Sequence, residues 1–198
     1  PDRWDHLARS RAGRLARAAN FAAGRLVSAD HIVQLLEAVI EPGDRVCIEG
    51  NNQKQADFLA RSLIQTNPAR LRDLHLVQSV LALPEHMDLI ERGQVSRIDF
   101  SFSGPQAGRL ARLVESGKIT IGAIHTYLEL FARYFVDLTP RVALIAAQAA
   151  DREGNLYTGP NTEDTPAIVE ATAFKGGIVI AQVNEIVDRL PRVDIPAD

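Results

Sequence analysis

The segment Arg45–Leu59, RVCIEGNNQKQADFL, decides how this sequence folds. Residues 45–49 predict a buried strand, the polar run from Gly50 predicts a tight loop, and residues 53–65 predict a helix. In open α/β sheets, a strand, a turn and a helix N-terminus together present backbone N–H groups to an anion. Four side-chain amides in the loop add neutral donors, which suit an oxyanion or a carboxylate. They belong to Asn51, Asn52, Gln53 and Gln55.

The same alternation of strand and helix continues along the chain. Further strands are predicted at 74–79, 98–102, 119–123, 142–149 and 178–183. Helices are predicted at 4–25, 32–40, 84–90, 106–115, 127–135 and 165–173. This pattern indicates an α/β fold, an open and mostly parallel sheet flanked by helices. The apolar runs at 142–147 and 177–181 fit strands that are buried on both faces.

Composition narrows the class of protein. A hydrophobic fraction of 46% in 198 residues is enough for a proper core, and a net charge of -3 argues against nucleic-acid binding. The single cysteine, Cys47, lies in an apolar run and is expected to be a core thiol, which fits a cytoplasmic protein. No apolar run is long enough for a membrane span. His6, His31, His75 and His86 lack metal-ligand spacing, so we expect no metal site.

An arginine-rich N-terminal segment precedes the regular pattern. We expect residues 1–27 to form a helical extension and residues 28–198 to form the α/β lobe. The arginines allow two interpretations: a basic helix that docks on an acidic partner, or a solvated helix that lies across the domain, and we favour the second. They are Arg3, Arg9, Arg11, Arg14, Arg17 and Arg25.

Polar residues follow the predicted strands at their carboxyl ends, where ligands bind in such sheets. The loop Gly50, Asn51, Asn52 and Gln53 follows the first strand and is the candidate oxyanion or substrate loop. The candidate substrate-binding residues at the other strand ends are Gln78, Ser103, Gly104, His125, Thr126 and Asn161.

Each candidate also has a structural interpretation. Asn51 can be a turn residue, Ser103 a helix N-cap, and His125 a hydrogen-bonded core histidine. Asp151–Gly154 resembles a plain hairpin turn. The polar residues 161–164 could be no more than helix caps, but we favour a binding role because a loop at the site end often carries binding groups.

Two glutamates lie at strand ends and are possible nucleophiles on position alone. Glu49 ends the first strand and Glu185 follows the last. Neither has an evident base beside it, and a strand-end glutamate is often part of a salt bridge, so we assign neither to catalysis.

Five stretches resemble the α subunit of bacterial malonate decarboxylase, and the resemblance runs from about Trp4 to Asp198. They are GNNQKQADFL (50–59), VQSVLALPEH (77–86), DFSFSGP (99–105), IGAIHTYLE (121–129) and TGPNTEDTPA (158–167). The order of motifs is also similar to the N-terminal half of family I CoA transferases, although residues 50–53 replace the Gly-rich loop of those enzymes.

The resemblance implies an acyl-carrier-protein transferase, which exchanges acetyl for malonyl on the carrier-protein thioester and releases acetate. It implies as partners the carrier protein and the decarboxylase subunits. It implies no directly bound cofactor, because the thiol belongs to a dephospho-CoA-type group on the carrier. In CoA transferases a glutamate attacks the thioester and forms a covalent intermediate.

That glutamate belongs to a C-terminal lobe that these 198 residues lack, so we expect one lobe of a longer polypeptide, inactive by itself. Two alternatives stay open. One is the corresponding subunit of citrate lyase, and the other is a non-catalytic ligand-binding lobe of the sugar-phosphate isomerase type.

Overall fold

The computed structural model describes residues 2–51, 53–162 and 164–191. The N-terminal part contains α1 (Asp2–Ala18), β1 (Ala22–Ala23), β2 (Leu26–Val27), a 3-10 turn (Ala29–His31) and α2 (Ile32–Val39). The strands that follow are β3 (Arg45–Ile48), β4 (Leu74–Val80), β5 (Val95–Phe102), β6 (Thr120–Ile124), β7 (Val142–Asp151), β8 (Leu156–Tyr157) and β9 (Ile178–Val187). The helices between them are α3 (Asp57–Gln65), α4 (Pro84–Glu91), α5 (Ala107–Glu115), α6 (Tyr127–Val136) and α7 (Thr165–Phe174).

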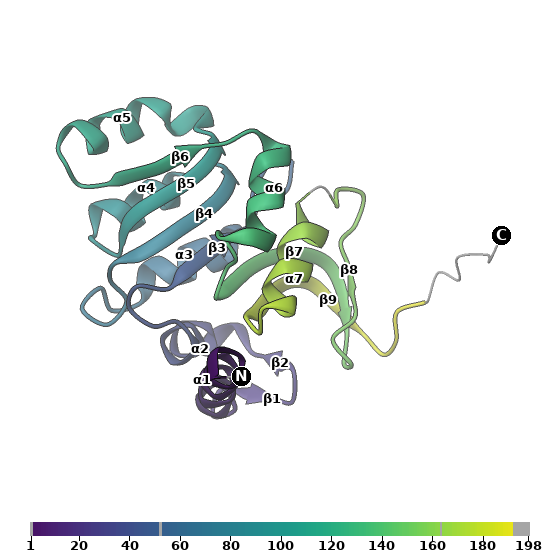
Figure 1. The fold of residues 1–198 in the computed structure, drawn as a ribbon. Helices are drawn as coiled ribbons and strands as arrows, with labels where there is room; N and C mark the ends of the chain where they lie inside the picture. The colour runs from purple at the N-terminus through teal and green to yellow at the C-terminus, as the bar shows by residue number, and fades with distance from the viewer. Residues whose placement is uncertain (1, 52, 163, 192–198) are drawn as a thin grey trace.

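The seven later strands form one sheet in the order β6-β5-β4-β3-β7-β8, with β9 paired to β7 (Figure 1). All neighbouring strands are parallel except β7 and β8, which form the hairpin expected at Asp151–Gly154. The predicted α/β fold with a mostly parallel sheet is therefore confirmed. The predicted N-terminal helix ends at Ala18, not at residue 25, because the chain turns at Gly24 (φ 65°) into the β1–β2 hairpin.

Helices cover both faces of the sheet. Side chains of α2 to α5 pack on one face and side chains of α6 and α7 on the other. Residues Val142–Ile145 of β7 are fully buried, as their apolar run predicts. The same prediction is wrong for β9, where Val179–Val183 are only half-buried, because β9 pairs with β7 alone. In the described part of the chain, no helix has the length and apolarity that a membrane crossing requires.

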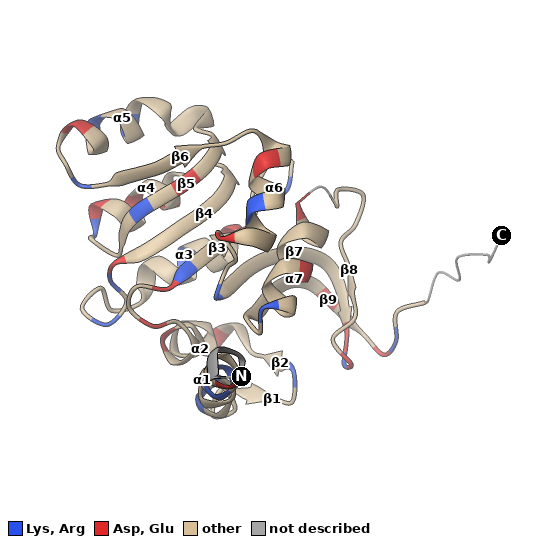
Figure 2. Ribbon diagram, in the orientation of Figure 1, with Lys and Arg blue, Asp and Glu red and all other residues tan. Residues whose placement is uncertain are grey.

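Charged residues lie mostly on the helices and near the strand ends (Figure 2). Arg14 of α1 is buried, and it binds the Asp44 carboxylate, the Val39 carbonyl (2.9 Å) and Glu41 (2.8 Å). Arg17 donates to the Ala38 carbonyl at 2.8 Å. These arginines therefore satisfy carbonyls at the C-terminal end of α2 and fix α1 to the domain. Such packing is what the interpretation of a helix lying across the domain expects.

We predict that Arg14→Ala lowers the free energy of unfolding by about 3 kcal/mol, because it leaves the buried Asp44 carboxylate without its cation. Arg11→Ala on the exposed face of the same helix should change it by less than about 0.5 kcal/mol. Urea unfolding measures both, and equal effects of the two substitutions would contradict the structural role of Arg14.

A buried histidine makes stability depend on pH. His86 of α4 is fully buried, its Nδ1 lies 2.9 Å from Gln78 Nε2, and burial lowers its pKa to about 4. The unfolded chain binds a proton at His86 below a pH of about 6.5, whereas the folded chain does not until about pH 4. Stability is therefore lost as the pH falls through this window, by up to about 3 kcal/mol.

We predict that His86→Gln removes this part of the pH dependence between pH 6.5 and 4. Urea unfolding at several pH values compares it with His31→Gln, an exposed control. A slope as steep in His86→Gln as in the unchanged protein would show that other groups cause the loss.

Candidate functional site

The loop after β3 is shaped by one asparagine side chain. Asn51 is buried, and its Oδ1 accepts hydrogen bonds from the N–H groups of Gln53 (2.7 Å) and Lys54 (2.9 Å). Gly50 and Gln55 then form an isolated antiparallel bridge. Residues 53–56 are consequently loop, and α3 begins at Asp57, so the prediction of a helix from residue 53 is wrong at its start.

The N-terminus of α3 does not face an open anion site. Gln182 of β9 accepts a hydrogen bond from the Leu59 N–H at 3.2 Å and donates to Asp57 at 2.9 Å. A side chain from the last strand therefore caps the helix. The N–H groups at the start of α3, which the local sequence predicts as part of an anion site, are therefore partly occupied by Gln182.

A buried charge pair lies directly beneath the loop. Glu49 Oε1 lies 3.0 Å from Lys54 Nζ, and Oε2 accepts a hydrogen bond from the Ala146 N–H at 2.8 Å. The Thr165 hydroxyl accepts from Lys54 and donates to Glu49. Glu49 is therefore the salt-bridged strand-end glutamate that the structural interpretation expects. Glu185 is exposed on β9.

A second buried cluster joins β4 to α7. The Ser79 hydroxyl donates to the Asp164 carboxylate, and Cys47 Sγ lies 3.9 Å from the Tyr134 hydroxyl. Burial raises the pKa of both Cys47 and Tyr134, so both stay protonated at neutral pH. Cys47 is thus the core thiol that its apolar surroundings predict.

Three of the candidate residues meet at the carboxyl end of the sheet. The Asn161 side-chain amide donates to Gln53 Oε1 at 2.9 Å. The side-chain amides of Asn51 and Asn161 also lie opposite each other, with each Nδ2 at 3.5 Å from the Oδ1 of the other residue. Gln53 is exposed and Asn161 is half-buried, so this amide cluster reaches the surface. Asn52 lies outside the described residues.

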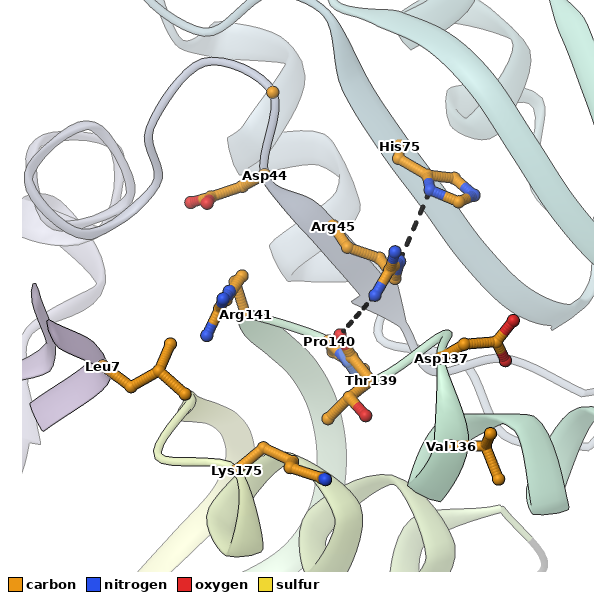
Figure 3. A pocket seen from close by; sticks show the side chains of 11 residues that line it. Leu7, Asp44, Arg45, His75, Val136, Asp137, Thr139, Pro140, Arg141 and Lys175 are labelled. Carbon is orange, nitrogen blue, oxygen red and sulfur yellow. Dashed lines mark hydrogen bonds between the residues drawn. The ribbon is translucent and has the colours of Figure 1, made fainter. Parts of the chain in front are cut away.

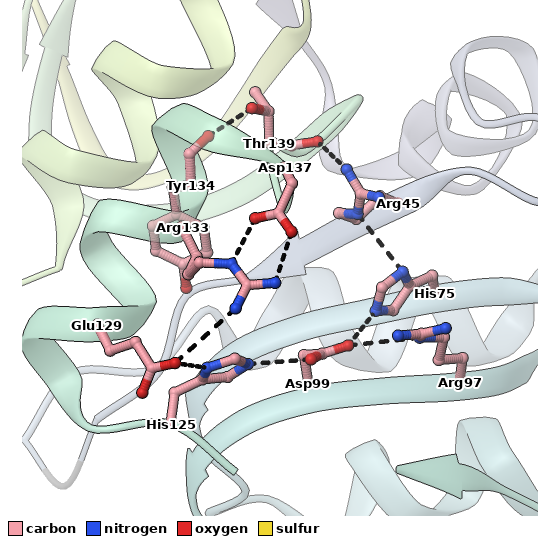
Figure 4. Close-up of polar contacts among 10 residues, drawn as sticks. All are labelled: Arg45, His75, Arg97, Asp99, His125, Glu129, Arg133, Tyr134, Asp137 and Thr139. Carbon is pink, nitrogen blue, oxygen red and sulfur yellow. Dashed lines mark hydrogen bonds and ion pairs between the residues drawn. The ribbon is translucent and has the colours of Figure 1, made fainter. Parts of the chain in front are cut away.

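His125 belongs to a separate polar network on the α6 face of the sheet (Figure 4). Its Nε2 donates to Asp99 at 2.9 Å, and its Nδ1 lies 3.1 Å from Glu129. Burial acts to raise the pKa of Asp99, but hydrogen bonds from His125 and His75 outweigh it and keep that pKa below its usual value. Thr126 caps α6 by accepting a hydrogen bond from the Glu129 N–H.

The remaining candidates lie apart from the amide cluster. Gln78 is fully buried and donates to His86 and to the Val80 carbonyl, so it does not line the strand-end surface. Gly104 turns the chain with a φ of 51°, and Ser103, which makes no capping hydrogen bond, lines a surface groove beside α5.

Local patterns did not single out Lys54, Thr165, Asp99 or His75 for these networks. One signal was available, because polar residues at 97, 99 and 101 alternate along β5 and indicate a polar sheet face. Gly122 of β6 belongs to the same face: a Cβ there would lie 2.6 Å from the Asp99 carboxyl carbon, so only glycine leaves room for that carboxylate.

Residues 3–198 match the family described as malonate decarboxylase, alpha subunit, transporter. The chain belongs to this family.

Among relatives, the acetyl-S-ACP:malonate ACP transferase of Malonomonas rubra is 54% identical over 197 residues, which is 98% of this chain and 35% of that protein. A Pseudomonas malonate decarboxylase hetero-tetramer solved in complex with malonate contains a chain with 56% identity and a TM-score of 0.94, covering 100% of this chain and 36% of that one. The malonate decarboxylase α subunit from Acinetobacter baumannii is 52% identical with a TM-score of 0.93. The match covers 98% of this chain and 36% of that one. The chain thus spans about a third of the length of these malonate decarboxylase relatives.

A more distant likeness concerns the fold alone. Glutaconate coenzyme A-transferase from Acidaminococcus fermentans matches with 13% identity and a TM-score of 0.61, over 79% of this chain and 66% of that one. The CoA-transferase-like fold that the sequence motifs imply is therefore confirmed.

We predict that Lys54→Met lowers the free energy of unfolding by about 3 kcal/mol, because it leaves the Glu49 carboxylate buried without a cation. The double variant Glu49→Gln/Lys54→Met should recover part of the lost free energy of unfolding, because it removes the buried charge. Lys118→Met, at an exposed lysine, is the control. Urea unfolding in a double-mutant cycle measures the coupling. Additive effects of the two substitutions would show that the pair does not stabilise the fold.

Proposed function

We propose that this chain is the N-terminal lobe of an acyl-carrier-protein transferase that exchanges acetyl for malonyl on a carrier-protein thioester and releases acetate. The observation that carries the proposal is the 54% identity, over nearly the whole chain, to a protein named acetyl-S-ACP:malonate ACP transferase. That protein is almost three times as long as the match, so the activity is proposed for the full polypeptide.

Transfer would proceed through a covalent glutamyl intermediate, as in CoA transferases. The nucleophilic glutamate would come from the rest of the polypeptide. Glu49 is a poor candidate, because Lys54, Thr165 and a backbone N–H already bind both of its oxygens. The 198 residues alone would consequently show no turnover.

The loop after β3 would contribute to the oxyanion site. Each tetrahedral intermediate needs hydrogen-bond donors around its oxygen. Asn51 would position the loop, while the amides of Gln53 and Asn161 reach the surface and could contact the thioester or malonate. Gly50 and Asn52 complete the proposed loop. Ser103, Gly104 and Thr126 remain proposed substrate contacts, whereas Gln78 and His125 are both buried and hydrogen-bonded within the domain, which favours a structural role for them.

The proposed partners are the carrier protein, whose dephospho-CoA-type group supplies the thiol, and the decarboxylase subunits in the cytoplasm. The hetero-tetrameric structure of the Pseudomonas relative supports a multi-subunit assembly. Docking of the carrier on α1 would depend on Arg9 and Arg11, since Arg14 and Arg17 are engaged within the domain.

An acyl-exchange assay with radiolabelled malonate and acetyl-carrier protein tests the proposal on the full-length polypeptide. Asn51→Asp keeps an oxygen that can accept from the Gln53 and Lys54 N–H groups, but replaces the amide nitrogen by a charged oxygen. We predict that kcat falls about 100-fold, because negative charge would oppose the developing oxyanion.

The control is Asn67→Asp, at a loop asparagine that accepts from the Ala69 N–H at 2.9 Å, for which we expect an unchanged kcat. Circular dichroism verifies folding. An unchanged kcat in Asn51→Asp would make the loop structural and move the search to Ser103 and Gly104. Absence of exchange by the unchanged full-length polypeptide, or clear turnover by residues 1–198 alone, would overturn the proposed activity or the proposed division of labour, respectively.

A further inference from the structure

A pocket of about 440 Å³ lies at the amino ends of β3, β4 and β7, at the opposite end of the strands from the amide loop (Figure 3). Arg45 and His75 line it from β3 and β4, Arg141 from the residue before β7, Lys175 from the end of α7 and Leu7 from α1. This volume is in the range of small-molecule binding sites.

The pocket carries an excess of positive charge. Its cationic side chains are Arg45, Arg141 and Lys175. Its two carboxylates are each neutralised from outside the pocket: Asp44 by the buried Arg14, and Asp137 by Arg133, through two hydrogen bonds of 2.5 Å. The field inside the pocket therefore favours an anion.

Arg45 is held in place at the centre of this charge. Its Nη1 donates to the Thr139 carbonyl at 3.0 Å, and its Nε donates to His75 Nδ1 at 3.4 Å. His75 Nε2 donates in turn to Asp99 at 2.6 Å, which fixes the imidazole (Figure 4). A guanidinium has five N–H groups, and two of them make these bonds, so the others can bind a ligand without reorganising the side chain.

Two like charges also lie close enough to interact here, those of Arg45 and Arg141. Burial lowers the pKa of Arg45, and Arg141 adds to this effect while Asp137 opposes it. Arg141 has no ion-pair partner among the described residues. An anion bound in the pocket would offset this repulsion.

We propose that this pocket binds a small oxyanion with two or more negative charges, that is, a phosphorylated or dicarboxylate molecule. The positive charge of Arg45 and Arg141 suits such an anion, and the volume of the pocket suits a small molecule. The site lies away from the amide loop, so this inference does not depend on the proposed transferase activity.

Titration calorimetry on the full-length polypeptide at low ionic strength tests it with three probes: inorganic pyrophosphate, malonate and the monoanion acetate. We expect pyrophosphate or malonate to bind more tightly than acetate. Arg141→Gln and Lys175→Gln should each weaken that binding about tenfold, the loss of one charge-assisted contact. Arg112→Gln, at an exposed arginine of α5, is the matched control and should bind as the unchanged protein does.

Pyrophosphate binding without malonate binding would assign a phosphorylated ligand, and the converse would assign a dicarboxylate. A malonate component that survives in Arg141→Gln belongs to another site. The proposal is overturned if no probe binds with a Kd below about 10 mM, if both pocket variants bind as tightly as the unchanged protein, or if Arg112→Gln loses as much affinity as they do. None of these results depends on acyl exchange, so failure here leaves the proposed function unaffected.

Discussion

The fold at the carboxyl end of the sheet depends on one buried charge pair, Glu49 with Lys54. A carboxylate placed there must be neutralised and hydrogen-bonded on both oxygens. Lys54 supplies the charge, Thr165 supplies a hydroxyl, and Ala146 supplies an N–H. The requirements of one carboxylate thereby bring together the loop after β3, the middle of β7 and the start of α7. The amide cluster lies directly above this point because Asn161 and Thr165 come from the same stretch of chain.

Local patterns predicted the elements well, because the strands are apolar runs and the helices carry one apolar face. The predicted start of α3 was wrong because side chains distant from the local pattern determine where this helix begins. Asn51 holds the Gln53 and Lys54 N–H groups in a turn, and Gln182, which is 123 residues from Leu59, caps the helix. Long-range side-chain contacts decide such boundaries, so propensity alone places them poorly.

The candidate site was predictable to a similar extent. Strand-end position correctly brought Asn51, Gln53 and Asn161 together, since the loops at one end of a parallel sheet converge. The same rule misplaced Gln78, because a residue near a strand end can point into the core instead of along the strand axis. It also missed the partners of His125, which are Asp99 on the neighbouring strand β5 and Glu129 on α6. Only the alternation of polar residues along β5 pointed to Asp99.

The network around Asp99 links the two ends of the sheet through side chains on a single face. His125 lies where β6 ends, Asp99 lies within β5, and His75 and Arg45 lie at the starts of β4 and β3. These four residues come from, or directly follow, the four adjacent strands β6, β5, β4 and β3, so the chain of hydrogen bonds crosses the sheet diagonally. It fits only because Gly122 leaves space above β6 for the carboxylate. The position of the pocket arginine therefore depends on packing at the far edge of the sheet. A change in that packing would reach Arg45 through this chain of hydrogen bonds.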